Sequence, residues 1–226
     1  MLWEWENGGT RVYVLDLDGT LMPSAEIDNA CYWQAVFGFF DRHGPIPDLH
    51  GFQHVSDSGI LQEWCRRELG REPGAGETRQ IKQLFGQHLE TAHTRQPHLF
   101  SPMPGATDWL TAISASGHVF AGIATGGWEH SARLKLKLSG LDRFALPLAS
   151  ADDAVRRTDI MQIAVQRLPG SQVIEKTAIT YIGDGVWDLL ASRELDWDFI
   201  GIASGQRAAQ LKQAGADNVR ENFCKT

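Results

Sequence analysis

Five short apolar runs are the feature that most limits what this 226-residue chain can fold into. They lie at residues 12–15, 119–124, 145–148, 178–182 and 199–203. Such runs are typical of strands that are buried on both faces. Segments with helical character separate the later runs, at residues 108–114, 129–138, 159–168, 186–195 and 206–214. Strands that alternate with helices predict an α/β fold with a parallel sheet covered on both faces.

The segment at residues 129–138 has two interpretations. Leucine and lysine alternate from position 134 to position 138, which is the period of a strand. Leu134, Leu138 and Leu141 also fall on one helical stripe, and Gly140 is a typical helix stop. We therefore expect a helix here.

A different pattern occupies residues 24–100, which contain no comparable β run. Helical candidates lie at residues 29–40, 59–69 and 78–94, and the proline-rich stretch at 102–105 marks the return to the α/β pattern. The sequence therefore predicts a helical insert at residues 24–100. Residues 1–23 and 101–226 form the α/β core domain in this interpretation.

Composition excludes several classes of partner. The formal net charge is −7, so no basic surface for nucleic acid or anionic lipid is expected. Three cysteines lie far apart in the sequence, which indicates reduced thiols. No apolar stretch approaches the roughly 20 residues that span a bilayer, and the acidic N-terminus does not resemble a secretory signal. We expect a cytoplasmic protein with no membrane or nucleic-acid partner.

Polar residues gather where the predicted strands end, and ligands bind beyond the carboxyl ends of strands in open parallel sheets. These residues are Asp16 and Asp18, Thr125 and Gly126, Asp184 and Asp188, with the pair Arg156 and Arg157 before the helix at 159–168. Each alone has a simpler explanation as a turn, a helix cap or a solvated pair. Together they predict one site. Clustered carboxylates suit Mg²⁺, and a hydroxyl followed by glycine suits an anion.

The motifs are similar to those of the haloacid dehalogenase superfamily of hydrolases. Residues 16–21 (Asp-Leu-Asp-Gly-Thr-Leu) resemble its first motif, residues 125–127 its second and residues 183–188 its fourth. The position of the insert resembles that of the subclass I cap, and residues 54–60 resemble a cap segment of phosphoglycolate-phosphatase-like members. The resemblance implies a Rossmann-like core with a helical cap domain.

The third motif departs from the family pattern. It usually supplies a lysine or arginine, often within a Gly-Lys-Pro stretch, and residues 151–160 contain no such stretch. Arg157 is the residue we expect in this role, and Arg156 is the alternative.

The resemblance also implies a mechanism. Asp16 would attack phosphorus and form an aspartyl-phosphate, while Asp18 would donate a proton to the leaving alkoxide and later take one from water. The resemblance further implies that the Asp16 carboxylate, the Asp18 main-chain carbonyl and Asp184 bind the metal. Thr125, Gly126 and Arg157 would bind the phosphoryl group. Asp188 would support the site. The implied cofactor is Mg²⁺, and the implied substrate is a small-molecule phosphate ester.

Other functions stay open at this point. Asp18 together with Asp184 favours phosphoryl transfer over the carbon–halogen chemistry of the superfamily's dehalogenases, which need neither an acid at this position nor a metal. A phosphomutase shares the same core motifs. A degenerate, non-catalytic binding protein is the alternative from another class. We further expect the insert to be a mobile lid over a small substrate.

Overall fold

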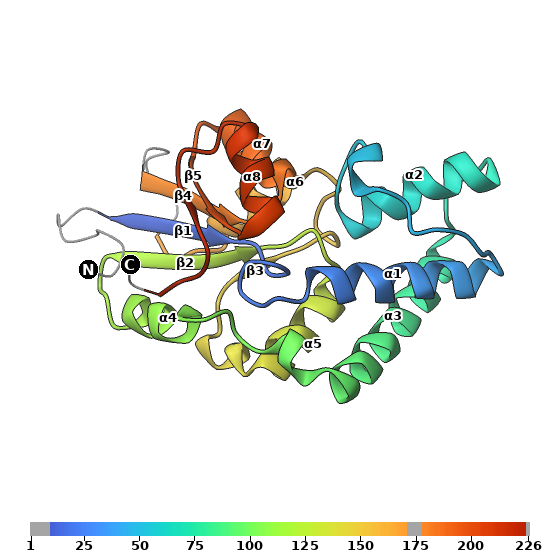
Figure 1. Ribbon diagram of the computed structural model, residues 1–226, viewed down its shortest axis with the longest axis horizontal. Coiled ribbons are helices and arrows are strands. Elements are labelled where there is room, and N and C mark those ends of the chain that lie inside the picture. The colour runs from blue at the N-terminus through green and yellow to red at the C-terminus, as the bar shows by residue number, and fades with distance from the viewer. Residues whose placement is uncertain (1–9, 171–177, 225–226) are drawn as a thin grey trace.

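The computed structural model describes residues 10–170 and 178–224, which form a six-stranded parallel sheet. The strand order is β3-β2-β1-β4-β5-β6, so the first strand lies inside the sheet (Figure 1). The strands are β1 (Arg11–Leu15), β2 (Val119–Ala124), β3 (Leu148–Ala149), β4 (Ile179–Gly183), β5 (Asp198–Ile202) and β6 (Val219–Arg220). Each paired strand runs parallel to its neighbour. The predicted α/β fold is confirmed.

Helices cover both faces of the sheet, as the continuous apolar runs predict. Tyr13 and Leu15 of β1 pack on one face with α4 (Ala106–Ser114) and α5 (Glu129–Ser139). Val12 and Val14 pack on the other, because successive side chains of a strand point to opposite faces. The helices on that second face are α6 (Arg157–Gln166) and α7 (Val186–Leu195), and α8 (Gly205–Gln213) lies beside β5 and β6.

The two edge strands of the sheet differ from what the sequence predicts. The strand expected at residues 145–148 is wrong in its bounds, because residues 141–144 form a 3₁₀ turn and Ala145 has a left-handed backbone with φ 48°. Only Leu148–Ala149 pairs with β2. The short edge strand β6 was not predicted, since two residues carry no periodic signal. The segment with two interpretations is helix α5, which ends at Ser139 with Gly140 as a left-handed cap.

The helical insert consists of α1 (Ala25–Phe40), α2 (Asp57–Leu69) and α3 (Ala75–Arg95), with 3₁₀ turns at Leu49–Gly51 and Pro97–Phe100. Figure 1 shows these helices together beyond the end of the sheet that lies away from both chain termini. Their aromatic core, which includes Trp33 and Phe85, continues into Trp128 and Leu134 of the α/β core. Helix α5 therefore lies between the sheet and the insert.

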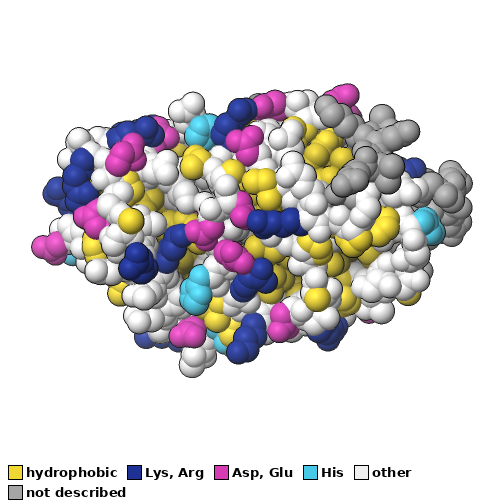
Figure 2. Space-filling model, turned by 180° about the vertical axis from the view of Figure 1, so that it is seen from behind, with side chains coloured by type: hydrophobic (Ala, Val, Ile, Leu, Met, Phe, Trp, Pro, Cys, Tyr) yellow, Lys and Arg dark blue, Asp and Glu magenta, His cyan; other side chains and the backbone are white. Residues whose placement is uncertain are grey.

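The surface carries mixed charge on the face in Figure 2, where Lys and Arg side chains are interspersed with Asp and Glu. Over residues 10–170 and 178–224, we find no helix whose length and hydropathy would let it cross a membrane.

Candidate active site

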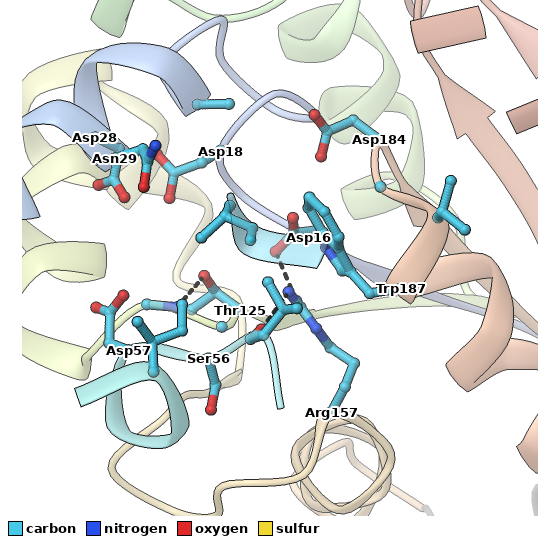
Figure 3. Close-up of a pocket in the computed structure, with 18 of the residues that line it drawn as sticks. Asp16, Asp18, Asp28, Asn29, Ser56, Asp57, Thr125, Arg157, Asp184 and Trp187 are labelled. Atoms are coloured by element: carbon cyan, nitrogen blue, oxygen red, sulfur yellow. Dashed lines mark hydrogen bonds and ion pairs between the residues drawn. The ribbon is translucent and has the colours of Figure 1, made fainter. Parts of the chain in front are cut away.

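A pocket of about 250 Å³ lies where the strand ends meet the insert. Figure 3 shows side chains from both parts of the chain directed toward it. The core supplies Asp16, Asp18, Thr125, Arg157 and Asp184, and the insert supplies residues that include Asp28 and Asp57. The structure thus brings the residues expected at three separate strand ends to one place.

The turn after β1 fixes Asp16 and shapes the pocket floor. The Asp16 N–H donates to the Ile182 carbonyl at 2.8 Å, which extends the β1–β4 ladder by one residue. Gly19 follows with φ 80°, a left-handed conformation that favours glycine. A Cβ atom at this position would collide with the Asp184 carboxylate. The glycine of the first motif therefore allows the first and fourth motifs to touch.

Three buried carboxylates, those of Asp16, Asp184 and Asp188, form the electrostatic centre of the site. One ligand oxygen from each lies within 4.8 Å of the others. Burial raises the pKa of Asp16 well above its usual value, and the charges of Asp188 and Asp184 raise it further against the opposing effect of Arg157. Burial, followed by the charge of Asp188, raises the pKa of Asp184 to about 7. Such a cluster requires nearby positive charge.

The same cluster fits a hard divalent cation. All three donors are carboxylate oxygens, which are the ligands Mg²⁺ prefers. Within the described part of the chain, Asp188 Oδ1 is buried without a hydrogen-bond partner, although the guanidinium of Arg157 lies 3.5 Å away. The carboxylate of Asp18 is not part of the cluster, because it contacts Ser24 and Lys135 instead. Asp188, expected only to support the site, lies inside the cluster.

Arg157 is the cation that lies beside Asp16 and Asp188 of this cluster. Its guanidinium lies 3.2 Å from Asp16 Oδ1 and also donates to the Val55 carbonyl of the insert at 3.2 Å. Burial by itself would lower the pKa of Arg157, but the neighbouring carboxylates outweigh burial and raise it. The alternative residue, Arg156, is 51% exposed and pairs with Glu194 at 2.5 Å. The two adjacent arginines therefore point to different environments.

The loop after β2 brings Thr125 and Gly126 to the pocket. Thr125 is buried, and its hydroxyl accepts the N–H of Gly127 at 3.1 Å. A Cβ atom at Gly126 would lie 2.8 Å from Arg157 Nη2 and 2.9 Å from the Val55 carbonyl oxygen. Glycine is therefore needed where this loop, the arginine and the insert converge.

The first turn of α2 closes one side of the pocket. The Asp57 N–H donates to the Gly126 carbonyl at 2.7 Å, and the Asp57 carboxylate accepts the Trp128 N–H at 2.9 Å. The Ser56 hydroxyl donates to the Val155 carbonyl at 2.7 Å. These bonds join the insert to the loops that follow β2 and β3.

Sequence reasoning missed several pocket residues. Arg207 donates to Asp184 Oδ2 at 2.8 Å and could have been found by the same strand-end rule, since it follows β5. Asp57 lies at a helix start, where an acidic residue has an ordinary explanation. Asp28 also lines the pocket and pairs with Lys135 behind it, a contact between residues 107 positions apart that no local pattern indicates.

The structure thus combines a parallel sheet, a helical insert and an acidic pocket at the strand ends, which is the architecture of an α/β protein with its ligand site at the sheet edge. Residues 10–196 match the family model of haloacid dehalogenase-like hydrolases. The chain belongs to the haloacid dehalogenase-like hydrolase family, as its motifs predict. No curated protein sequence matches the chain.

Solved structures share the fold over nearly the whole chain. A hydrolase from Pseudomonas syringae is 22% identical with a TM-score of 0.70, covering 93% of this chain and 92% of that one. A mutant of CbbY from Rhodobacter sphaeroides, in complex with xylulose-(1,5)bisphosphate, is 15% identical with a TM-score of 0.69 and 95% coverage of both chains. A predicted phosphoglycolate phosphatase from Haemophilus somnus is 16% identical with a TM-score of 0.62 and 95% coverage of both. At these identities the shared property is the fold.

Proposed function

We propose that this hydrolase is a magnesium-dependent phosphatase that cleaves a small-molecule phosphate monoester through an aspartyl-phosphate. The observation that carries the proposal is the position of Asp16. It lies at the end of β1 with one cation, Arg157, at 3.2 Å and two further buried carboxylates close by. A nucleophile flanked by a cation and an acidic cluster suits attack on a phosphoryl group.

The chemistry divides into two displacements. In the first, a carboxylate oxygen of Asp16 forms a bond to phosphorus, and the bond to the leaving oxygen breaks as Asp18 gives that oxygen its proton. In the second, water attacks the phosphorus of the aspartyl-phosphate, Asp18 takes the water proton, and the Asp16 carboxylate leaves with inorganic phosphate as the product. Arg157 favours the ionised form of Asp16 that the first step needs.

The phosphoryl group is held by Thr125, the Gly126 N–H and Arg157. Asp188, whose Oδ1 lies 3.5 Å from Arg157, orients that guanidinium. The Asp16 carboxylate, the Asp18 main-chain carbonyl and Asp184 would hold Mg²⁺, which supplies positive charge that neutralises the phosphoryl oxygens.

A small substrate suits the size of the pocket. At about 250 Å³, it lies below the usual range for sites that take drug-sized ligands, roughly 300–1,000 Å³. The structurally similar CbbY has been solved with phosphate and, as a mutant, with a sugar bisphosphate. These observations support a phosphorylated metabolite as substrate.

Removal of the metal tests the proposal. We expect EDTA to lower hydrolysis of 4-nitrophenyl phosphate by about 10²-fold or more, because the buried carboxylates would then repel the phosphoryl group, and added Mg²⁺ to restore it. Calorimetry of Mg²⁺ binding to the protein and to Asp184→Asn gives a readout independent of turnover. Activity that EDTA does not change would contradict the metal assignment.

We also propose that residues 24–100 act as a cap domain that opens and closes over the substrate. The two connections to the core lie side by side, since the Met103 N–H donates to the Leu21 carbonyl at 2.7 Å, and such a paired connection suits a hinge. Opening would break the hydrogen bonds of Ser56 and Asp57 to the core loops.

A cap of this kind predicts selectivity for small esters. We expect kcat/KM for the best of several sugar phosphates and phosphoglycolate to exceed that for a phosphopeptide by at least about tenfold, because a peptide would prevent closure. Steady-state kinetics of the intact enzyme measure this ratio. A phosphopeptide that reacts faster than every small ester would rule out the lid.

A further inference from the structure

Lys135 is a fully buried cation that the proposed mechanism does not use. It lies on α5, and its side chain is 0% exposed on the helix side that also buries Ser131, Ala132 and Leu136. An ammonium group is rarely placed in a protein interior without partners, because it loses its hydration. Its position therefore calls for a specific role.

Two carboxylates surround the ammonium group. Lys135 Nζ lies 2.5 Å from Asp28 Oδ1 and also forms an ion pair with Asp18 Oδ2. These two ion pairs compensate the buried ammonium group for the hydration that it loses. The two ion pairs of Lys135 connect three parts of the chain, namely α5, the start of α1 and the loop after β1.

The second oxygen of Asp18 is also bound. The Ser24 hydroxyl donates to Asp18 Oδ1 at 2.6 Å. Ser24 is the N-cap residue of α1, yet its side chain makes no capping hydrogen bond to the helix. A serine at this position ordinarily accepts a helix N–H. Here its hydroxyl donates to the Asp18 carboxylate instead. Ser24 lies in the same helical turn as Asp28, because the Asp28 N–H donates to the Ser24 carbonyl at 2.8 Å.

Each carboxylate oxygen of Asp18 therefore has its own donor, and the donors come from different elements. This arrangement leaves the side chain little freedom to rotate. Figure 3 shows Asp18 and Asp28 side by side on one wall of the pocket, with Asp16 and Arg157 paired apart from them. The contacts of Lys135 therefore fall on the proposed proton donor and not on the proposed nucleophile.

We propose that Lys135, held in place by Asp28, is a positioning residue that fixes the carboxyl group of Asp18, so that the proton which Asp18 took from water in the preceding turnover passes to the leaving oxygen. This inference rests on the proposed phosphatase function and on Asp18 as its acid. Loss of Lys135 would then slow the cleavage of esters whose leaving oxygen needs a proton. Esters whose leaving group departs as a stable anion would be affected far less.

The test compares two substrates in the Lys135→Met variant. They are 4-nitrophenyl phosphate, whose leaving group needs no proton, and the alkyl phosphate that the wild type hydrolyses fastest. We expect kcat/KM, which reports the steps up to departure of the leaving group, to fall at least about tenfold more on the alkyl ester than on the aryl ester, as part of the roughly 10²–10⁴-fold that general acid catalysis contributes. Rapid quench and intact mass spectrometry should show the phosphoenzyme forming from the aryl ester at the wild-type rate.

Two further variants complete the design. Lys137→Met is the matched control, because Lys137 is exposed on the same helix and should leave both activities unchanged. Lys135→Met with Asp28→Asn removes the second buried charge that the single change leaves unpaired, so it remains informative if the single variant does not fold. The double variant should keep the alkyl-selective loss.

The outcomes separate the inference from the proposed function. Equal losses of kcat/KM on both esters in a folded variant would show that Lys135 only stabilises the fold, and would overturn the inference alone. A wild type that hydrolyses neither ester would overturn the proposed function and the inference with it.

Discussion

Replacing Asp16 with asparagine is expected to lower kcat by on the order of 10⁶-fold, the scale seen when a catalytic nucleophile is removed from a hydrolase. The amide is nearly the same size as the carboxylate, so the backbone ladder from Asp16 to Ile182 should persist. The change also removes one of three mutually repelling buried carboxylates. The variant should therefore fold at least as well as the wild type while losing turnover.

Initial rates on 4-nitrophenyl phosphate, with thermal unfolding of the same samples, check both expectations. Asp108→Asn is the matched control, because Asp108 is exposed on α4. Asp18→Asn gives the complementary result, since a good leaving group still allows the first displacement and the missing base then lets the phosphoenzyme accumulate. Full activity in Asp16→Asn would exclude Asp16 as the nucleophile.

The second large effect is expected at Arg157. Replacement by alanine should lower kcat by about 10²–10³-fold, by analogy with the loss of one preorganised donor at a developing charge. Its guanidinium lies 3.2 Å from Asp16 Oδ1 and its side chain is only 11% exposed, so water replaces it poorly. Arg156→Ala should cost little, because that side chain pairs with Glu194 at the surface, where such pairs contribute about 0–1 kcal/mol.

Parallel kinetics of the two alanine variants and of Arg157→Lys measure this difference. Lysine keeps the charge but not the donors that reach Asp16 and the Val55 carbonyl, so we expect partial activity. A larger loss in Arg156→Ala than in Arg157→Ala would move the role to Arg156. Small, equal losses would mean that neither residue contacts the phosphoryl group.

Local sequence determined the sheet and the places where chemistry is found. The apolar runs at β1, β2 and β4 are each followed by polar residues, and parallel strands bring their carboxyl ends to one edge. Hydrophobic period and a glycine stop were enough to predict helix α5 despite its alternating leucines and lysines. The family followed from the same short motifs, because they are continuous in sequence.

Only the tertiary structure decided which basic side chains pair with which carboxylates. Arg156 and Arg157 are neighbours of the same type, and the sequence left Arg156 open as an alternative; the start of α6 turns Arg156 to the surface and Arg157 to Asp16. Lys135 and Lys137 differ as strongly, because one side of α5 is enclosed between the sheet and the insert.

Ion pairs such as that of Lys135 with Asp28 join residues more than a hundred positions apart, and no local period encodes them. The sequence by itself therefore determined the strands, the helices and the strand-end motifs, since these follow from neighbouring residues. The packing of α1 and α5 around Asp18 decided that its carboxylate pairs with Lys135, whereas Asp16 pairs with Arg157, because distance and burial set the electrostatic energy of each group.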